Sequence, residues 1–397
     1  MPELVTDRRW RPQVAVLAFG AFAVGTDAFV IAGLLPDISR SLSVSVGAAG
    51  QLVSVFSLAY AVLSPMLAAL TGHWSRRAVL VAALLVFAVG NVATALVPGY
   101  PLVLAARVLA AAGAALFTPN AGATAATLAG DRSRGQAIAV VTLGLTCSMV
   151  VGAPLGTAIG NAWGWRATMW FVTALAAVVV PIIALRLPRL RSAGAPGLRQ
   201  RLAPLTDLRL VRVLAGTLLA FVGIYLPYTY ISAVFAPALG GDDSRVAVLL
   251  LAFGVAGTVG NLVAGKLADR YGPRRVVVTA TLVLTAVFLV MPPTRGVLAW
   301  VVPVVALAGF CSWSVTTPQQ HRAIALSPAG AGPLAVSLNA SVLYLAVSLS
   351  SAIGAVALER SGSAGVLPMI AAGFVLAAAV LTWLSGPAER HARPSPT

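Results

Sequence analysis

The chain has 397 residues, of which 59% are apolar and only 10% are charged, and its mean hydropathy is +0.92. This composition excludes an ordinary soluble domain, in which about a quarter of the residues carry a charge. A net charge of +16 would indicate nucleic-acid binding in a soluble protein. Here the basic residues follow the loops between apolar segments, so no nucleic-acid partner is expected.

Apolar runs of about 20 residues, the length that crosses ~30 Å of hydrocarbon as a helix, recur along the whole chain. We expect spans at residues 13–35, 48–70, 78–97, 101–125, 135–159, 167–186, 210–237, 246–268, 276–292, 297–317, 334–358 and 364–385. The expected fold is therefore an all-α polytopic membrane protein with twelve transmembrane helices. The first span is longer than the apolar core of a signal peptide and further spans follow at once, so no cleavage is expected.

The first span carries Asp27 within the stretch GTDAFVIAGLLPD, residues 25–37. A carboxylate inside a span costs about 2.5–3.5 kcal/mol even on lenient insertion scales, so its presence indicates a function. The chain has 11 acidic residues, and the other ten fall in loops or near helix ends. Asp27 is therefore the predicted proton carrier.

The fourth span, which contains RVLAAAGAALFTPNA at 107–121, places Arg107 about 9 Å of helix from Pro101, and Asp27 lies about 13 Å from Pro36. An arginine at that depth needs a partner, and Asp27 is the candidate. Burial favours the protonated carboxyl and a guanidinium favours the ionised one, so a change in either lets the acid exchange protons. The alternatives are a permanently ionised pair that locks the two helices, and an Arg107 that snorkels to the outer face.

The fifth span contains GLTCSMVVGAPLGTAIG, residues 144–160, a run of small residues broken by one proline. Glycines four residues apart let another helix approach closely, and a proline permits a bend. Ordinary packing of small residues is the alternative reading. The residues of this motif are Gly144, Gly152, Pro154, Gly156 and Gly160.

Of the 27 basic residues, twenty-one fall in one set of alternate loops or in the tails, five in the other set, and Arg107 lies inside a span. The positive-inside rule then places both termini and the long central loop in the cytoplasm. That loop divides the chain into an N-terminal bundle at 1–186, a loop at 187–209 and a C-terminal bundle with its tail at 210–397. The stretch 186–212 is either an amphipathic segment on the inner leaflet or a solvated linker.

The stretch GKLADRYGPRR at 265–275 follows the eighth span, and GHWSRRAVL at 72–80 follows the second. The former matches the signature G-x-L-A-D-R-x-G-R-[RK] of the major facilitator superfamily, which the chain resembles. The resemblance implies two six-helix bundles around a central cavity, and a cytoplasmic latch in which Asp269 caps a helix and pairs with Arg270 and Arg274. The motif at 72–80 lacks the Asp-Arg pair, so a symmetrical latch is in question. The latch residues are Gly265, Asp269, Arg270, Gly272, Arg274 and Arg275.

Within that superfamily the chain resembles the twelve-spanner drug:proton antiporters, a group that includes amphenicol, purine and sugar exporters. The resemblance rests on the glycine run of the fifth span with WGWR at 163–166, and on Arg107 before Gly113. It also rests on FVIAGLLPDIS at 29–39, TPQQHR at 317–322 and SLNASVLYLAVSLSSAIGA at 337–355. Those relatives commonly carry a glutamate where this chain has Ala28. The acid is shifted to Asp27, which rotates the side chain by about 100° around the helix.

Such a fold binds its substrate near the membrane midplane, between the two bundles. The candidate substrate-binding residues are Tyr60, Asn120, Tyr225, Tyr228, Tyr230, Trp313, Asn339 and Tyr344. Each of them alone also fits as a packing residue or as part of an interfacial aromatic belt. A largely apolar wall with few polar anchors suits a lipophilic compound that is uncharged or weakly cationic.

The predicted function is proton-coupled export of small lipophilic drug-like molecules or metabolites across the cell membrane, by a monomer that alternates its access. A facilitator or proton symporter for a sugar or nucleoside is the alternative. An enzyme is not expected, because no catalytic constellation or GxxxxGK[ST] motif occurs. No cofactor or metal is expected either, since His73, His321 and His391 lack ligand spacing and Cys147 and Cys311 lack a CxxC partner.

Overall fold

The computed structural model describes residues 10–188, 190, 206–242, 244–326 and 332–386. The described part of the chain is helical and contains no strand. Its helices are α1 (Trp10–Leu42), α2 (Val46–Leu70), α3 (Arg76–Leu96), α4 (Tyr100–Cys147), the π-helix η1 (Ser148–Gly152), α5 (Ala153–Trp163), α6 (Trp165–Arg186), α8 (Leu208–Thr229), α9 (Ile231–Val234), α10 (Ala236–Leu239), α11 (Ser244–Tyr271), α12 (Pro273–Thr294), α13 (Leu298–Trp313), α14 (Thr316–Ala325), α15 (Gly332–Ser361), the short 3-10 helix η3 (Ala364–Val366) and α16 (Leu367–Leu384).

In the described part of the chain, twelve helical segments are long and apolar enough to cross a membrane, which confirms the predicted number of spans. The chain of α4 holds the fourth span and the start of the fifth, because Gly130 takes a positive φ of 66° and breaks the helical path there. The fifth span continues through η1 and α5, and α13 with α14 forms the tenth. Apolar run length is therefore a sound guide to this fold, whereas helix ends depend on single residues such as Gly130.

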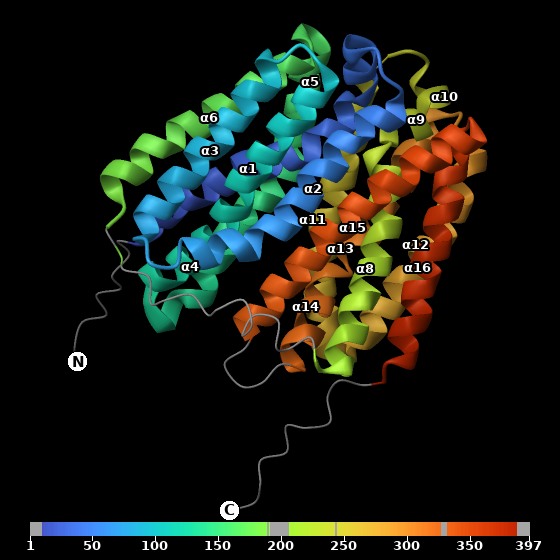
Figure 1. Ribbon diagram of the computed structural model, residues 1–397. Helices are drawn as coiled ribbons and strands as arrows, with labels where there is room; N and C mark the ends of the chain where they lie inside the picture. Colours follow the sequence, from blue (N-terminus) through green and yellow to red (C-terminus); the bar gives the residue numbers. More distant parts are fainter. Residues whose placement is uncertain (1–9, 189, 191–205, 243, 327–331, 387–397) are drawn as a thin grey trace, which may run out of the picture.

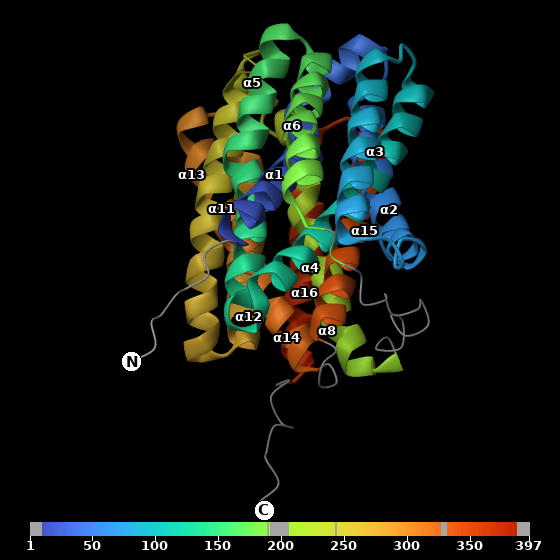
Figure 2. The same cartoon turned by 90° about the vertical axis from the view of Figure 1, so that its left-hand side faces the viewer.

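The helices form two groups that lie side by side in Figure 1, with α1–α6 in blue to green and α8–α16 in green to red. We call these groups the N-terminal and C-terminal bundles. The bundles meet where α2 packs along α15 and where α11 packs on α5 and η1, as Figure 2 shows for α11 and α5; α1 also contacts α8, α9 and α11. Most of the predicted connecting loop, 187–209, lies outside the described residues.

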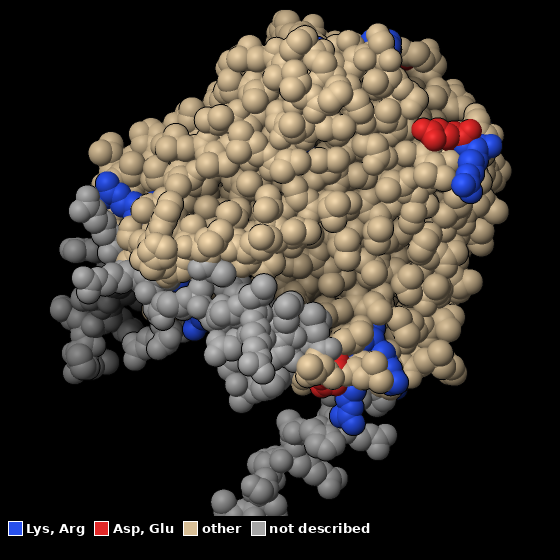
Figure 3. Space-filling model, in the orientation of Figure 1, with Lys and Arg blue, Asp and Glu red and all other residues tan. Residues whose placement is uncertain are grey.

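Exposed tryptophans mark both ends of the bundles. At the end where α1 begins and α16 finishes, here called the termini end, Trp74 and Trp383 are 41% and 62% exposed. At the opposite, far end, Trp163 and Trp300 are 75% and 64% exposed. On the face shown in Figure 3 the broad middle is free of charged side chains. Tryptophan at both borders of an uncharged band is typical of a protein embedded in a bilayer.

Among the described residues, a cluster of buried side chains shared between the bundles lies toward the far end. One cluster there combines Leu34 and Leu52 of the N-terminal bundle with Leu226 and Leu250 of the C-terminal bundle. Toward the termini end each bundle has its own cluster, one around Phe87 and one around Leu214 and nearby residues. Figure 1 shows the two groups of ribbons diverging toward that end. The described conformation is thus joined at the far end.

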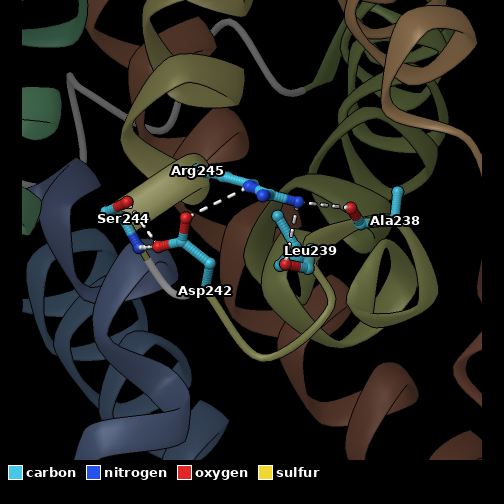
Figure 4. A network of polar contacts seen from close by, with 5 residues as sticks. All are labelled: Ala238, Leu239, Asp242, Ser244 and Arg245. Carbon is cyan, nitrogen blue, oxygen red and sulfur yellow. Dashed lines mark hydrogen bonds and ion pairs between the residues drawn. The ribbon is translucent and has the colours of Figure 1, made fainter.

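A small polar network holds the turn that leads into α11 at the far end (Figure 4). The Nε of Arg245 donates to Asp242 at 3.1 Å, and its guanidinium also donates to the carbonyl of Leu239 at 3.3 Å. The Ser244 hydroxyl and backbone N–H both donate to Asp242. The side-chain hydrogen bond from Ser244 is the main cause that lowers the pKa of Asp242 from its ordinary value. Arg245 thereby supplies hydrogen bonds to the carbonyls at the end of α10, which have no partner within the helix.

Candidate functional site

Asp27 of α1 and Arg107 of α4 form a buried ion pair inside the N-terminal bundle. The Arg107 Nη1 lies 2.6 Å from the Asp27 Oδ1, and the side chains are 1% and 0% exposed. The guanidinium also stacks over the ring of Phe56 on α2, 4.3 Å from its centroid. The predicted encounter of the two charges is therefore present, and an Arg107 that snorkels to the outer face is excluded.

The pair is only partly satisfied. The Oδ2 of Asp27 and the Nε of Arg107 are both buried and have no hydrogen-bond partner among the described residues. A buried ion pair is favourable only when its remaining hydrogen-bonding atoms are also paired. This pair therefore gains less from staying ionised than a fully bonded one.

The fifth span packs closely against the part of α1 that carries Asp27. A Cβ on Gly144 would collide with the carbonyl of Ala18, and one on Gly152 would collide with the side chain of Thr26. Gly156 and Gly160 likewise face Val30 and Leu34. The close helix approach predicted from the glycine spacing is thus present, and its partner is α1. Pro154 lies in the first turn of α5, directly after η1.

A pocket lies between the bundles, beside this part of α1. In this conformation its cavity volume is about 30 Å³, within about 410 Å³ of space between atoms that includes open solvent. Both bundles supply its wall, which is lined by Ala28, Phe29, Ala32, Val53 and Ser57 from the N-terminal bundle and by Tyr225, Tyr228, Thr229, Leu343, Tyr344 and Val347 from the C-terminal bundle. None of these lining residues is charged. The pocket lies between the bundles, and the binding of a substrate there stays a prediction.

The acid and the pocket lie on neighbouring faces of α1. Ala28 lines the pocket, whereas Asp27 points to Arg107 inside the bundle. A shift of one residue turns a side chain by about 100° around the helix, and for this reason Asp27 and Ala28 face different neighbours. The carboxylate is adjacent to the pocket in sequence but does not line it.

The predicted wall residues fall into two sets. Tyr225, Tyr228 and Tyr344 line the pocket, and Tyr60 stacks on Tyr344 from across the interface with ring centroids 3.6 Å apart.

The other predicted wall residues do not line the pocket. Asn120 accepts a hydrogen bond from Arg76, Tyr230 donates to the carbonyl of Ser351, Asn339 accepts from Thr217, and Trp313 packs on Gly257. Each of these contacts stays within one bundle, and Tyr230 also packs against Gly50 of α2 across the interface. The structural reason is that a polar side chain within a span can satisfy its polar atoms on a neighbouring helix of its own bundle.

Sequence reasoning missed Ser57, Thr229 and Phe29 as pocket residues. Ser57 lies one helical turn before Tyr60, and Thr229 lies between Tyr228 and Tyr230. Their positions next to the predicted tyrosines were the signal that could have found the two hydroxyls. The sequence carries no comparable signal for Phe29, one of many apolar residues in its span.

The latch motif occupies the termini end of α11 and the start of α12, where Gly272 takes a φ of 85°. Asp269 is exposed, and no ion pair joins it to Arg270 or Arg274 within the described ranges. Arg274 instead donates to the carbonyls of Thr382 and Trp383 at the end of α16. The acidic part of the latch stays a prediction.

The remaining latch residues are placed as follows. Arg270 stacks on Tyr271, with its Cζ 5.2 Å from the ring centroid, and Arg275 is exposed. Gly265 has no atom within 4 Å of the place where a Cβ would stand, so close packing does not require its glycine.

Comparison with known proteins agrees with this architecture. The model of the Major Facilitator Superfamily matches residues 17–329 and 213–397. The uncharacterized MFS-type transporter YbcL of Bacillus subtilis is 32% identical over 95% of this chain and 97% of its own length. The chloramphenicol resistance protein of Streptomyces lividans is 33% identical over 92% of this chain and 94% of its own.

Among solved structures, a mutant of the nucleoside transporter NupG superposes with a TM-score of 0.77 over 95% of this chain and 99% of its own. Its sequence identity of 12% shows a shared fold alone. The fold, the family model and the two curated relatives lead to one assignment. The chain belongs to the Major Facilitator Superfamily of membrane transporters, which are not enzymes.

Proposed function

We propose that this transporter is a proton-coupled antiporter that exports small lipophilic molecules, uncharged or weakly cationic, and that Asp27 carries the proton. The observation that carries the proposal is the buried, incompletely bonded pair of Asp27 and Arg107 next to the pocket. Ionisable groups within spans mark ion and proton pathways, and this is the one such pair found among the described residues.

Proton binding changes the electrostatics of the N-terminal bundle in a defined way. A proton on Asp27 removes the counter-ion of Arg107 and leaves the guanidinium with the Phe56 ring as its neighbour. An unpaired buried charge is destabilised by several kcal/mol. The protonated state therefore favours a conformation in which water or another group reaches Arg107. This preference links proton binding to the alternation of the two bundles.

The orientation of the chain in the membrane and the class of substrate are supported by separate observations. The excess of arginine in one set of loops supports cytoplasmic termini, in which case the described conformation is closed toward the outside. The uncharged pocket wall and the similarity to a chloramphenicol resistance protein support a drug-like substrate. The pocket lies within a single chain, so the transporter is proposed to act as a monomer.

One observation favours a second candidate, a facilitator or proton symporter for a small metabolite. Ala28, and not an acid, lines the pocket, so no carboxylate touches a bound substrate directly. In that case the pair of Asp27 and Arg107 holds α1 and α4 together and stays ionised throughout the cycle.

Reconstituted vesicles with an imposed pH gradient distinguish the two candidates. Asp27→Asn should abolish accumulation of chloramphenicol against its gradient while downhill exchange persists, because the amide fixes the neutral state. Asp242→Asn, which removes an acid in a far-end turn, is the matched control and should behave as wild type. Arg107→Gln should move the pH optimum of transport upward, because the guanidinium stabilises the ionised carboxylate. Wild-type accumulation by Asp27→Asn would refute the coupling role of Asp27.

A further inference from the structure

Tyr60 of α2 and Tyr344 of α15 meet across the interface between the bundles. Their ring centroids are 3.6 Å apart and their planes differ by 19°, so the rings lie face to face with little offset. Toward the far end from this pair, α2 and α15 continue in contact through Ser54, which donates to the carbonyl of Ser348. Tyr60 and Tyr344 thus lie at the termini-end edge of the contact between α2 and α15. Beyond this edge each bundle has its own core.

Face-to-face stacking with so little offset is an unfavourable arrangement for two phenol rings. Aromatic pairs prefer offset or edge-to-face geometry with centroids about 4.5–7 Å apart, because the two negative ring faces repel each other. A planar ring of opposite quadrupole, one depleted of electrons by its substituents, would be attracted to both faces. Inserted between the tyrosines, it would replace one repulsive contact with two attractive ones.

We propose that Tyr60 and Tyr344 form a slot for a planar, electron-poor aromatic ring of the substrate. The proposal rests on the proposed function, because it assumes that a small molecule is transported through the adjoining pocket. Tyr344 itself lines that pocket, and Ser57 lies on α2 one turn before Tyr60. A ring held in the slot can therefore extend a second group toward the hydroxyls of Ser57 and Thr229 and the phenols of the pocket wall. The ligand class is an uncharged molecule with an electron-poor ring and a hydrogen-bonding arm.

The slot also ties ligand binding to the relative position of the bundles, since each bundle contributes one wall. Carbon atoms in contact stand about 3.5–4.0 Å apart, so an inserted ring spreads the tyrosines to about 7 Å. Occupancy of the slot must therefore separate the bundles locally or turn the two side chains. A ring bound to only one bundle would impose no such change.

Three alcohols with the same arm test the slot: 4-nitrobenzyl alcohol, 4-methoxybenzyl alcohol and cyclohexylmethanol. Their binding to the purified protein in detergent, without any gradient, is measured by calorimetry. The nitro compound should bind most tightly. Tyr60→Leu and Tyr344→Leu should each weaken its binding by about two- to twelvefold, the value of one stacking contact, and leave cyclohexylmethanol unchanged. Tyr271→Leu, at a tyrosine that is 48% exposed, is the matched control and should change nothing.

A second variant separates ring electronics from shape. Tyr344→pentafluorophenylalanine keeps a planar ring but reverses its quadrupole, so the methoxy compound should gain affinity relative to the nitro compound. Equal binding of the three alcohols by wild type, no binding by any, or an equal loss of all three in the leucine variants would overturn the slot. Size-exclusion profiles and melting temperatures identify variants that fail to fold.

The proposed function and the slot can fail separately. Discrimination between the alcohols without proton-driven accumulation in vesicles would leave the slot standing and refute the antiporter. Proton-driven accumulation by a protein that binds the three alcohols equally would support the antiporter and refute the slot.

Discussion

Two serine hydroxyls are predicted to hold the far end of the molecule closed. Ser54 of α2 donates to the carbonyl of Ser348 at 2.8 Å, and Ser351 of α15 donates to the carbonyl of Gly50 at 2.5 Å. Both serines are buried, at 6% and 0% exposure, so water does not replace a lost bond. A hydrogen bond between helices in a membrane contributes about 0.6 kcal/mol on average and at most about 1.7. The double variant Ser54→Ala/Ser351→Ala should therefore destabilise far-end closure by about 1–2 kcal/mol.

That free energy corresponds to a change of about 5- to 30-fold in the ratio of far-end-open to far-end-closed molecules. The ratio can be measured by electron paramagnetic resonance between spin labels at Ser43→Cys and Glu359→Cys, two exposed positions at the far end of opposite bundles. Cys147 and Cys311 are first replaced by serine. The double variant should increase the long-distance population in vesicles at a fixed pH.

Ser350→Ala is the control for this measurement. Ser350 is also fully buried on α15, but its hydroxyl donates to the carbonyl of Val347 within the same helix. Its loss should leave the distance distribution unchanged. If the double variant and the control give the same distribution, the inter-bundle serines do not hold the far end closed and the reasoning is wrong.

Three further predictions address packing, pH and topology. Gly152→Ala should lower the free energy of unfolding by about 1–3 kcal/mol in thermal melts, because its Cβ meets Thr26, whereas Gly122→Ala has no atom within 4 Å and should be tolerated. The lowered pKa of Asp242 means that the carboxylate stabilises the fold above its ordinary value of 3.8 and loses that effect as pH falls through the lowered value. The melting temperatures of wild type and Asp242→Asn should therefore differ near pH 7 and converge as the pH falls through the lowered pKa of Asp242. Reporters fused after residue 200 should be cytoplasmic and those within 238–245 external, and an external loop at 186–212 would contradict the arginine rule.

The sequence was sufficient for the spans and made Asp27 and Arg107 candidates for a charge pair, but it left open an Arg107 that snorkels to the outer face. Run length alone located the twelve spans, because the bilayer fixes how long an apolar helix must be. Asp27 and Arg107 stood out because a charge within an apolar run is rare and needs a partner at a similar depth. The glycines of the fifth span predicted a close helix contact, though not that α1 would be the partner.

The orientation of each span about its own axis could not be predicted in the same way. In a membrane both the lipid and the bundle interior are apolar, so the period of polar residues that orients a soluble helix is missing. Tyr225 and Asn339 both looked like wall residues, but Tyr225 faces the pocket while Asn339 faces Thr217 of its own bundle. The stack of Tyr60 on Tyr344 depends on how two distant helices rotate, and no local pattern records that rotation.

The π-helical turn Ser148–Gly152 has a consequence for the register of the fifth span. Residues four apart overshoot a full α-helical turn of 3.6 residues by about 40°, so a stripe with that spacing drifts steadily around a straight helix. A π-turn bonds i to i+5 and holds more residues, which turns the stripe back. Gly144 and Gly160 can therefore both face α1, although they lie sixteen positions apart. In evolutionary terms the turn behaves as a one-residue insertion, and deleting one residue from it would rotate Gly156 and Gly160 by about 100° away from α1.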